Sequence, residues 1–551
     1  MNVRLRHVLS VVATIAFATV AGCDLLRGYT EGRGARIETF EATATDRLEL
    51  GAARFVFDDF HGLSTDTLET TALPWKVAGT ALLLADDPSA PPTQARLRTI
   101  LSRFGFLYPE RIANWPWPEQ PTFADAPLGL VDGRIRRRLP AIELDTVNLG
   151  CAGCHAGVLH DADGNATGAV WLGLPNTSLD LDGYVDAVFD ALTALGDDPD
   201  TLFVALRQAW PETSEREIAT IRRFVWPRLA KRLPELARAG GALPFRNGGP
   251  ARSNGVDALK HRLGALPAND SAAAVSIPML FDVSLRSSLL VDGLYTARGT
   301  ERFQARDRRM PDPPERLAGI VGYFTVPTMG VEPDRVPDML PRIADAVAFL
   351  FGTMPPAFPG RIDADSAERG ERLYAAHCAG CHGSYREIDG MLRLTGFPNR
   401  LVPLDEIATD RARIDAISPD LVGAINDSEI GRQQIAARSG GYVATALTGL
   451  WATAPYLHNG SVPTLWHLMR PTRRPSRFQV GGHRLDLDRI GIAGETAANG
   501  DWLYAEDYRP WSTPSLSDST TPGQHNGGHV APFDALDEAA KDDLLEYLKR
   551  L

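Results

Sequence analysis

The most chemically informative residues of this chain are four cysteines that occur in two matching pairs. Residues 151–155 and 378–382 both have the sequence CAGCH. Two thiols at positions i and i+3 lie on one helical turn, so both can bond to the vinyl groups of one haem, and the next histidine then serves as proximal ligand to the iron. The pattern predicts two covalently bound haem c groups, attached or ligated by these residues: Cys151, Cys154, His155, Cys378, Cys381 and His382.

Two other chemistries also use paired cysteines. A structural zinc site needs four ligands, so further Cys or His would have to follow at compact spacing. A thioredoxin-like dithiol needs neither a histidine directly after the second cysteine nor a second identical copy. Because the two motifs use every cysteine after Cys23, the pattern favours haem attachment over both.

The N-terminus predicts export. Arg4 and Arg6 precede an apolar run, residues 8–20, that is too short to span a bilayer comfortably. Residues 20–23 (VAGC) resemble a bacterial lipobox, in which the signal is cleaved before the cysteine and the thiol is lipidated. We therefore expect a signal peptide at 1–22, lipidation of Cys23, a tether at 23–40 and an exported protein, lipid-anchored on the periplasmic side of a bacterial membrane. The alternative is a plain signal peptide with an incidental cysteine.

Composition narrows the class of protein further. The chain has 551 residues, of which 44% are apolar and 23% charged, which excludes a disordered chain and a multi-span membrane protein. The formal net charge of −12 argues against nucleic acid as a partner, because phosphate binding needs a basic surface. At about 150 residues per domain, the length allows two to four domains.

Apolar spacing predicts a mainly α fold. Helical periodicity runs over 184–195, 201–210 and 215–239, the last interrupted at Pro227 and Pro234. After a Pro-rich linker at 355–361, a helix over 365–377 leads directly into the second motif.

A last helix over 537–551 closes the chain, and Gly370 would let it approach the helix before the motif closely. This order is the layout of a small cytochrome c domain. We therefore expect two c-type cytochrome domains with long loops, one at 41–354 that is enlarged by insertions and one at 355–551.

One segment carries a specific resemblance. Residues 453–465 (TAPYLHNGSVPTL) are similar to a stretch of the bacterial dihaem cytochrome c peroxidase superfamily. Residues 474–491, the NGGH sequence at 526–529 and the terminal helix resemble the rubber-oxygenase branch, which also includes fatty-acid dioxygenase relatives. The resemblance covers residues 355–551 well and residues 41–340 thinly.

The resemblance implies roles for particular histidines. The C-terminal haem would be six-coordinate, with His382 as proximal and His529 as distal ligand, and would hold electrons. Met469 is the rival distal ligand, because the peroxidases proper place a methionine on this iron. The haem on His155 would have an open or weakly held position for peroxide or oxygen, which makes His155 a catalytic ligand.

His458 has two interpretations. In the first it lies between the haems as a catalytic residue that assists electron or proton movement. In the second it is a structural histidine that is held by the turn at Asn459 and Gly460.

The chain departs from the family at one position. Where the family usually has Trp-Asp-Gly, residues 291–293 are Val-Asp-Gly, so a Trp relay between haems is missing. A peroxidase also needs an acid–base group beside the open iron. Glu301 is the only candidate that we identify, and it is weak, which favours oxygen chemistry or electron transfer.

Three functions follow from these observations. The first is an exported peroxidase-like dihaem oxidoreductase that reacts peroxide at the N-terminal haem and takes electrons, through the C-terminal haem, from a small cytochrome or cupredoxin. The second is a haem-dependent dioxygenase acting on an apolar unsaturated substrate, such as a polyisoprene or fatty acid. The third is a non-catalytic electron-transfer lipoprotein, in which His160, His261 or another histidine caps the first haem. Calcium between the domains is left open by the sequence.

Overall fold

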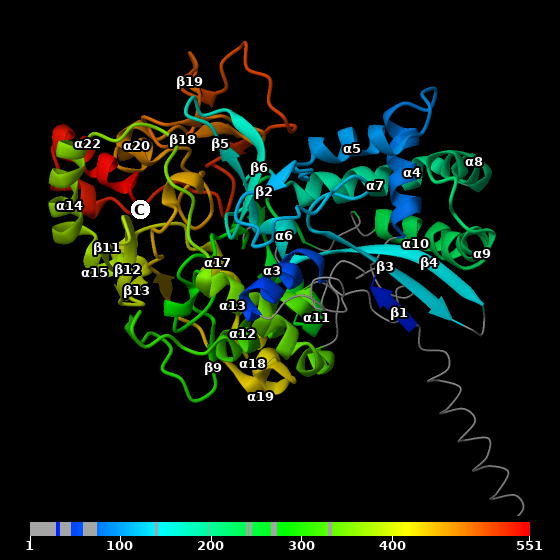
Figure 1. The fold of residues 1–551 in the computed structure, drawn as a ribbon, viewed down its shortest axis with the longest axis horizontal. Helices are drawn as coiled ribbons and strands as arrows, with labels where there is room; N and C mark the ends of the chain where they lie inside the picture. Colours follow the sequence, from blue (N-terminus) through cyan, green and yellow to red (C-terminus); the bar gives the residue numbers. More distant parts are fainter. Residues whose placement is uncertain are drawn as a thin grey trace, which may run out of the picture.

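The computed structural model describes residues 29–32, 46–58, 74–137, 141–196, 198–238, 241, 245–265, 273–328 and 333–551 (Figure 1). The structure is 41% helical and 17% strand, with the strands in several small sheets. The prediction of a mainly α fold is therefore wrong, and two separate cytochrome domains are not shown. Residues 1–22 and Cys23 lie outside the described residues.

The sequence analysis did not predict these strands, and the reason is physical. Many are two or three residues long, too short to show a period-two pattern, such as β10 (Arg306–Asp307). Several also pair with partners that are remote in sequence. Strand β9 (Tyr295–Ala297), for example, pairs antiparallel with β14 (Gln434–Ala436).

The described sheets are all small. Three of them have three strands, in the orders β1 (Tyr29–Gly32), β3 (Leu130–Arg137), β4 (Ile142–Leu149); β2 (Arg111–Ile112), β6 (Ala166–Leu172), β5 (Ala156–His160); and β10, β12 (Met391–Phe397), β11 (Ser384–Ile388). One has four strands, in the order β19 (Glu495–Thr496), β20 (Trp502–Leu503), β16 (Arg477–Val480), β21 (Ser515–Asp518). Four are strand pairs: β13 (Leu401–Pro403) with β15 (Gly441–Val443), β14 with β9, β17 (Leu485–Asp486) with β18 (Gly491–Ile492), and β7 (Arg252–Ser253) with β8 (Val275–Ser276). Part of the predicted tether is thus a strand, because β1 pairs with β3.

A helical unit with its own apolar core lies at one end of the molecule, on the right in Figure 1. Its helices are α4 (Trp75–Asp86), α5 (Gln94–Arg103), α7 (Leu181–Leu195), α8 (Pro199–Ala209), α9 (Glu215–Thr220) and α10 (Trp226–Arg238). The predicted helices over 184–195 and 201–210 are confirmed by α7 and α8. The third predicted helix runs through Pro234 without ending, and a π-helical turn at Ile221–Val225 precedes Pro227. Lys76 fixes this unit through buried ion pairs of 2.8 Å to Asp145 and 2.6 Å to Glu217.

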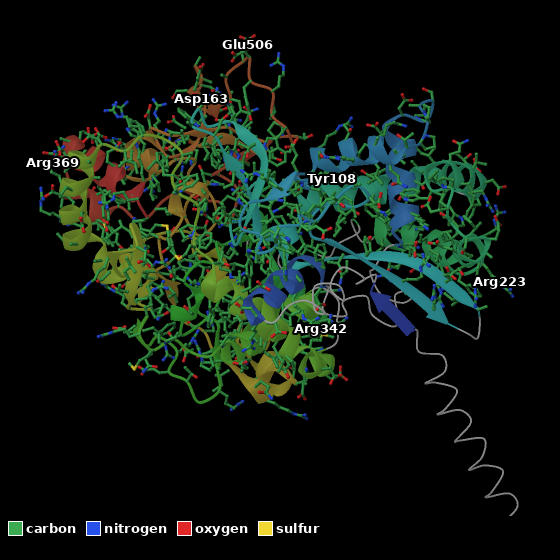
Figure 2. The ribbon with its side chains drawn as sticks, viewed as in Figure 1. Tyr108, Asp163, Arg223, Arg342, Arg369 and Glu506 are labelled. Carbon is green, nitrogen blue, oxygen red and sulfur yellow. The ribbon has the colours of Figure 1, made fainter. Side chains whose placement is uncertain are left out.

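A second core surrounds the first CAGCH motif. Its helices are α3 (Arg47–Phe57), α6 (Cys151–Cys154), α11 (Gly255–Leu263), α12 (Pro314–Thr328), α13 (Leu340–Gly352), α17 (Ala412–Ala416), α18 (Pro419–Asp427) and α19 (Ile430–Gln433). Arg342 of α13, labelled in Figure 2, pairs with the buried Asp58 at the end of α3. Leu421 and Ile425 of α18 join this core, so the chain after the second motif returns to the first one. The domain boundary at residue 354 stays a prediction.

The third core surrounds the second motif. Its helices are α14 (Ala364–His377), α15 (Ala379–His382), α20 (Leu465–Leu468), α21 (Ala531–Asp534) and α22 (Glu538–Leu548), with α16 (Leu404–Ile407) nearby. A Cβ on Gly370 would lie 2.0 Å from the carbonyl oxygen of Asp543, so the predicted close approach of α14 and α22 is confirmed. Arg369, labelled on the outer side of α14 in Figure 2, pairs with the side chain of Asp543 at 2.6 Å.

None of the described helices is both long and apolar enough to cross a membrane.

Candidate functional site: two CAGCH motifs on one cavity

The first motif forms the short helix α6, which begins after Gly150 and ends at His155. Close packing requires glycine on the facing segment, because a Cβ on Gly129 would lie 2.0 Å from the backbone nitrogen of Gly153. The Nδ1 atom of His155 lies 3.0 Å from the carbonyl oxygen of Pro278. As donor to that oxygen, Nδ1 fixes the ring and leaves Nε2 as the available ligand atom.

The second motif is built in the same way. Helix α14 leads through Cys378 into α15, and the Tyr374 hydroxyl donates to the carbonyl oxygen of Gly383 at 2.9 Å. The Nδ1 atom of His382 lies 2.7 Å from the carbonyl oxygen of Thr445. Both motif histidines thus use one ring nitrogen on a backbone carbonyl, which is the usual orientation of a metal-ligating imidazole.

Burial favours the neutral forms of three of the motif thiols and of both motif imidazoles. Burial raises the pKa of Cys151, Cys154 and Cys378 to about 12, which is opposite to the lowered pKa of a reactive redox thiol. Burial lowers the pKa of His155 to about 4 and lowers that of His382 as well. Within the described residues, no three His, Cys, Asp or Glu side chains converge as metal ligands, so neither cysteine pair has the further ligands of a zinc site.

His529 faces His382. The two ring centroids are 6.0 Å apart, and the rings are inclined by 48°. A metal bound by two imidazole nitrogens at about 2 Å each would separate the centroids by about 6 Å, so the gap fits one iron. The Nδ1 atom of His529 is buried and has no hydrogen-bond partner within the described structure. These residues therefore fit a six-coordinate haem.

Hydrogen bonds from its own backbone and from Arg474 fix the loop that carries His529. His529 adopts a positive φ of 54°, and its backbone N–H donates to the carbonyl oxygen of Ile407 at 2.8 Å. Arg474 donates from Nη1 to the carbonyl oxygens of Asn526 at 2.6 Å and Gly528 at 2.9 Å. Its Nη2 donates to the carbonyl oxygen of Leu468 at 2.7 Å.

Met469, the rival ligand, is 1% exposed and also lines the cavity described next. Arg474 therefore holds the backbone beside both candidate ligands.

One cavity of about 630 Å³ joins the two motifs. Its wall includes the following residues: Cys151, His155, Cys378, Cys381, His382, His458, Met469 and His529. On the side of His155 the wall is apolar, formed by the core of the first motif with these side chains: Leu289, Leu290, Leu317, Val321, Ile343, Val347 and Leu350. The fold thus brings together every predicted site residue of the described chain except Cys154, which packs against the helical unit beside the same motif.

The cavity has few acid–base groups. Among the described residues on its wall, Glu406 is the one carboxylate, and it pairs with Arg400 at 2.6 Å. Glu301 is exposed and does not line the cavity. His160 and His261 do not line it either, since the half-buried His160 stacks on His483 and His261 is exposed on α11.

His458 lies between the two anchoring loops. Its ring stacks on Tyr442 with a centroid distance of 4.1 Å, and Tyr442 is three residues before Thr445. Its carbonyl oxygen accepts from the N–H of Ser276 at 2.8 Å, two residues before Pro278. Burial, together with the charge of the nearby Arg413, lowers the pKa of His458 to about 3.

Three buried residues around His458 were missed by the sequence analysis. Arg252 donates to the carbonyl oxygens of Asn459 at 2.7 Å and Gly460 at 2.9 Å, which fixes the turn after His458. Arg413 pairs at 2.6 Å with Asp292, which is fully buried. Asp292 stood in a segment noted for its resemblance and its missing Trp, but its pairing with Arg413 was not predicted, and nothing in the sequence marked these arginines as buried.

Comparison with known proteins gives a short match in this region. Residues 441–479 match the family described as RoxA-like, cytochrome c-like. The match supports a relationship to RoxA-related cytochromes c. It includes Tyr442, His458, Met469 and Arg474, and it implies covalently bound haem c and a haem oxidoreductase in general. Membership of the dihaem peroxidase superfamily and the number of two haems stay predictions.

Two relatives come from Sinorhizobium fredii. The uncharacterized protein y4iM is 34% identical over 229 residues, which cover 36% of this chain and 52% of y4iM. The uncharacterized protein y4iJ is 26% identical over 264 residues, which cover 36% of this chain and 42% of y4iJ. The chain thus spans about half the length, or less, of these curated relatives.

Proposed function

We propose that this protein is an exported dihaem c-type oxidoreductase. The observation that carries the proposal is the single cavity on which both CAGCH motifs open, each with its histidine anchored through Nδ1 to a backbone carbonyl. Haem bound there would supply one-electron and oxygen chemistry, and the protein would supply orientation and exclusion of water.

We assign different tasks to the two motifs. His382 and His529 would hold one iron from both sides, as their ring separation of 6.0 Å supports, and this haem would store or transfer electrons. His155 has no histidine or methionine assigned to the opposite side of its iron. That haem would therefore be the place where a small molecule reacts.

The wall near His155 favours an oxygen-dependent reaction on an apolar unsaturated substrate. Its side chains are aliphatic, and the one carboxylate on the described wall, Glu406, is engaged with Arg400. Cleavage of one C=C bond by O₂ gives two carbonyl groups and needs no external reductant. The aliphatic side chains would hold the substrate and exclude water, while the lack of an unpaired carboxylate among the described wall residues disfavours peroxide cleavage.

The test uses the purified protein with its covalent haem content measured first. Electron paramagnetic resonance of the ferric protein should show one high-spin and one low-spin haem. Oxygen uptake should then start on addition of polyisoprene or oleate, with both atoms of ¹⁸O₂ in the carbonyl products. A variant with Cys151→Ala and Cys154→Ala should retain the low-spin signal and lose the uptake. Two low-spin haems that bind no added ligand, even after half-reduction, would instead support a pure electron carrier.

A peroxidase is the second candidate, and His458 is the observation that favours it. It is the histidine on the described cavity wall that burial keeps neutral and that is not assigned to an iron, whereas His377, also on that wall, is exposed. A base is what peroxide cleavage requires. This candidate predicts peroxide consumption with a reduced small cytochrome or cupredoxin as donor, and loss of that activity in His458→Gln. Peroxide turnover without oxygen uptake would select it over the oxygenase.

Export and lipid anchoring at Cys23 belong to the same proposal. Mass spectrometry of the mature N-terminus should find a diacylglycerol on Cys23, and Cys23→Ser should release the protein from the membrane fraction.

A further inference from the structure

The side chain of Arg286 lines the cavity, and none of the described carboxylates pairs with its guanidinium. Arg286 follows the short 3-10 helix at Val283–Leu285, and its backbone is fixed, because its N–H donates to Val283 at 3.1 Å and its carbonyl oxygen accepts from Arg316 at 2.6 Å. Its side chain lines the cavity wall, where Nη2 has a long contact of 3.4 Å to the Thr445 hydroxyl. No ion pair joins Arg286 to any carboxylate of the described residues.

Three other arginines of the described chain have protein partners instead. Arg413, the other arginine on the cavity wall, is paired with Asp292 at 2.6 Å. Arg252 and Arg474 each donate to four neutral oxygens of the protein. Arg286 differs from all three in having neither a carboxylate nor a set of carbonyl oxygens.

The charged guanidinium of Arg286 destabilises the folded protein unless an anion binds to it. Burial lowers the pKa of Arg286 to about 10, so the group is still charged at neutral pH. Taking a charge out of water without giving it a counter-ion destabilises the folded protein. The planar guanidinium matches the two oxygens of a carboxylate, and such bidentate contacts are among the strongest hydrogen bonds in proteins.

We propose that Arg286 is the recognition site for a carboxylate brought into the cavity by its occupant. This inference rests on the proposed function, in which haem and substrate share the cavity. The carboxylate has two sources, a haem propionate or the head group of a free carboxylic acid. In either case it would be held beside Thr445, the residue whose carbonyl oxygen anchors His382.

The experiment compares Arg286→Gln and Arg286→Lys with Arg309→Gln, a control that removes an exposed arginine paired with Asp307. Covalent haem content is measured first in every variant. If wild-type protein carries no haem, the proposed function fails independently of Arg286, and the second arm below still tests the arginine.

In the first arm, resonance Raman spectra report the haem propionate bending band, and redox titrations report the midpoint potentials. A propionate source predicts that Arg286→Gln shifts the band and lowers the potential of one haem, because the freed anion stabilises ferric iron. Arg286→Lys should restore both in part, and Arg309→Gln should change neither.

In the second arm, palmitate and methyl palmitate are titrated into each protein. A free-acid source predicts that Arg286→Gln weakens palmitate binding by about tenfold, the loss of one charge-assisted contact, while methyl palmitate binding is unchanged. A response in either arm supports the carboxylate site and identifies its source. If Arg286→Gln matches wild type and Arg309→Gln in both arms at normal haem content, the inference is overturned.

Discussion

Arg474→Ala tests whether the distal ligand is positioned by its loop. Arg474 makes four contacts to backbone carbonyl oxygens, and two of these, to Asn526 and Gly528, hold the turn before His529. A hydrogen bond from a charged donor contributes about 1.5–3 kcal/mol, and neighbouring bonds are not additive, so we expect a total loss of about 3 kcal/mol. About half of that loss, about 1.5 kcal/mol, falls on the His529 loop. It should raise about tenfold the fraction of molecules in which His529 is detached from the iron.

The assay is the rate of cyanide binding to the ferric C-terminal haem, which depends on detachment of His529 even when the detached fraction is small. Arg474→Ala should increase that rate about tenfold, and Arg474→Lys should increase it less. Arg477→Ala is the matched control, because Arg477 lies three residues away and its partly exposed guanidinium pairs with Asp501 at 2.8 Å instead of with the His529 loop. An Arg474→Ala protein that unfolds more easily in urea but binds cyanide at the wild-type rate would refute the positioning argument.

Three further predictions concern the ligand and the stability of the fold. His529→Ala should leave haem attached but make the C-terminal ferric iron high-spin, whereas Met469→Leu should stay low-spin by electron paramagnetic resonance; the opposite pattern would reassign the ligand to Met469. Lys76→Met leaves the buried Glu217 without its cation and leaves Asp145 with Arg134 alone, so it should lower the free energy of unfolding by about 3–5 kcal/mol in urea titrations, while Lys541→Met, whose partner Glu538 is exposed, should have little effect. Burial lowers the pKa of His160 to about 4 and of His483 to about 3, so the unfolded imidazoles bind protons first as pH falls below about 6.5. The free energy of unfolding should therefore fall by about 2 kcal/mol per histidine between pH 7 and pH 5; His483→Gln should flatten this dependence and His261→Gln should not, and an equal slope in both would contradict the assignment.

The sequence analysis succeeded where the determining contacts are local. Periodic apolar residues predicted α7 and α8, and Gly370 predicted the close approach of α14 to the terminal helix. It failed for the sheets, because strands such as β9 and β14 are three residues long and pair across more than a hundred residues. Strand pairing of that kind depends on the tertiary fold, so it leaves no local pattern to detect.

The site was predictable only in part for a related reason. The two CAGCH motifs concentrate their chemistry in five consecutive residues, and they were found at once. Arg252 and Arg474 act through backbone carbonyls, which every residue has, so no partner side chain marks them in the sequence. Arg474 lay within a segment quoted for its resemblance, but its contact with the His529 loop required the structure.

The choice between the two proposed chemistries depends on one side chain. A general base works best when its pKa is near the operating pH, and burial holds the pKa of His458 at about 3, about four units below neutrality. Its ring is stacked on Tyr442, and Arg252 fixes the turn that follows it, so both contacts favour a held, neutral ring over one that takes up a proton. Peroxide cleavage would need that ring to accept a proton and return it. Oxygen addition to an unsaturated chain makes no such demand on the protein, and the aliphatic wall near His155 would suit the apolar chain that the proposed oxygenase has to bind.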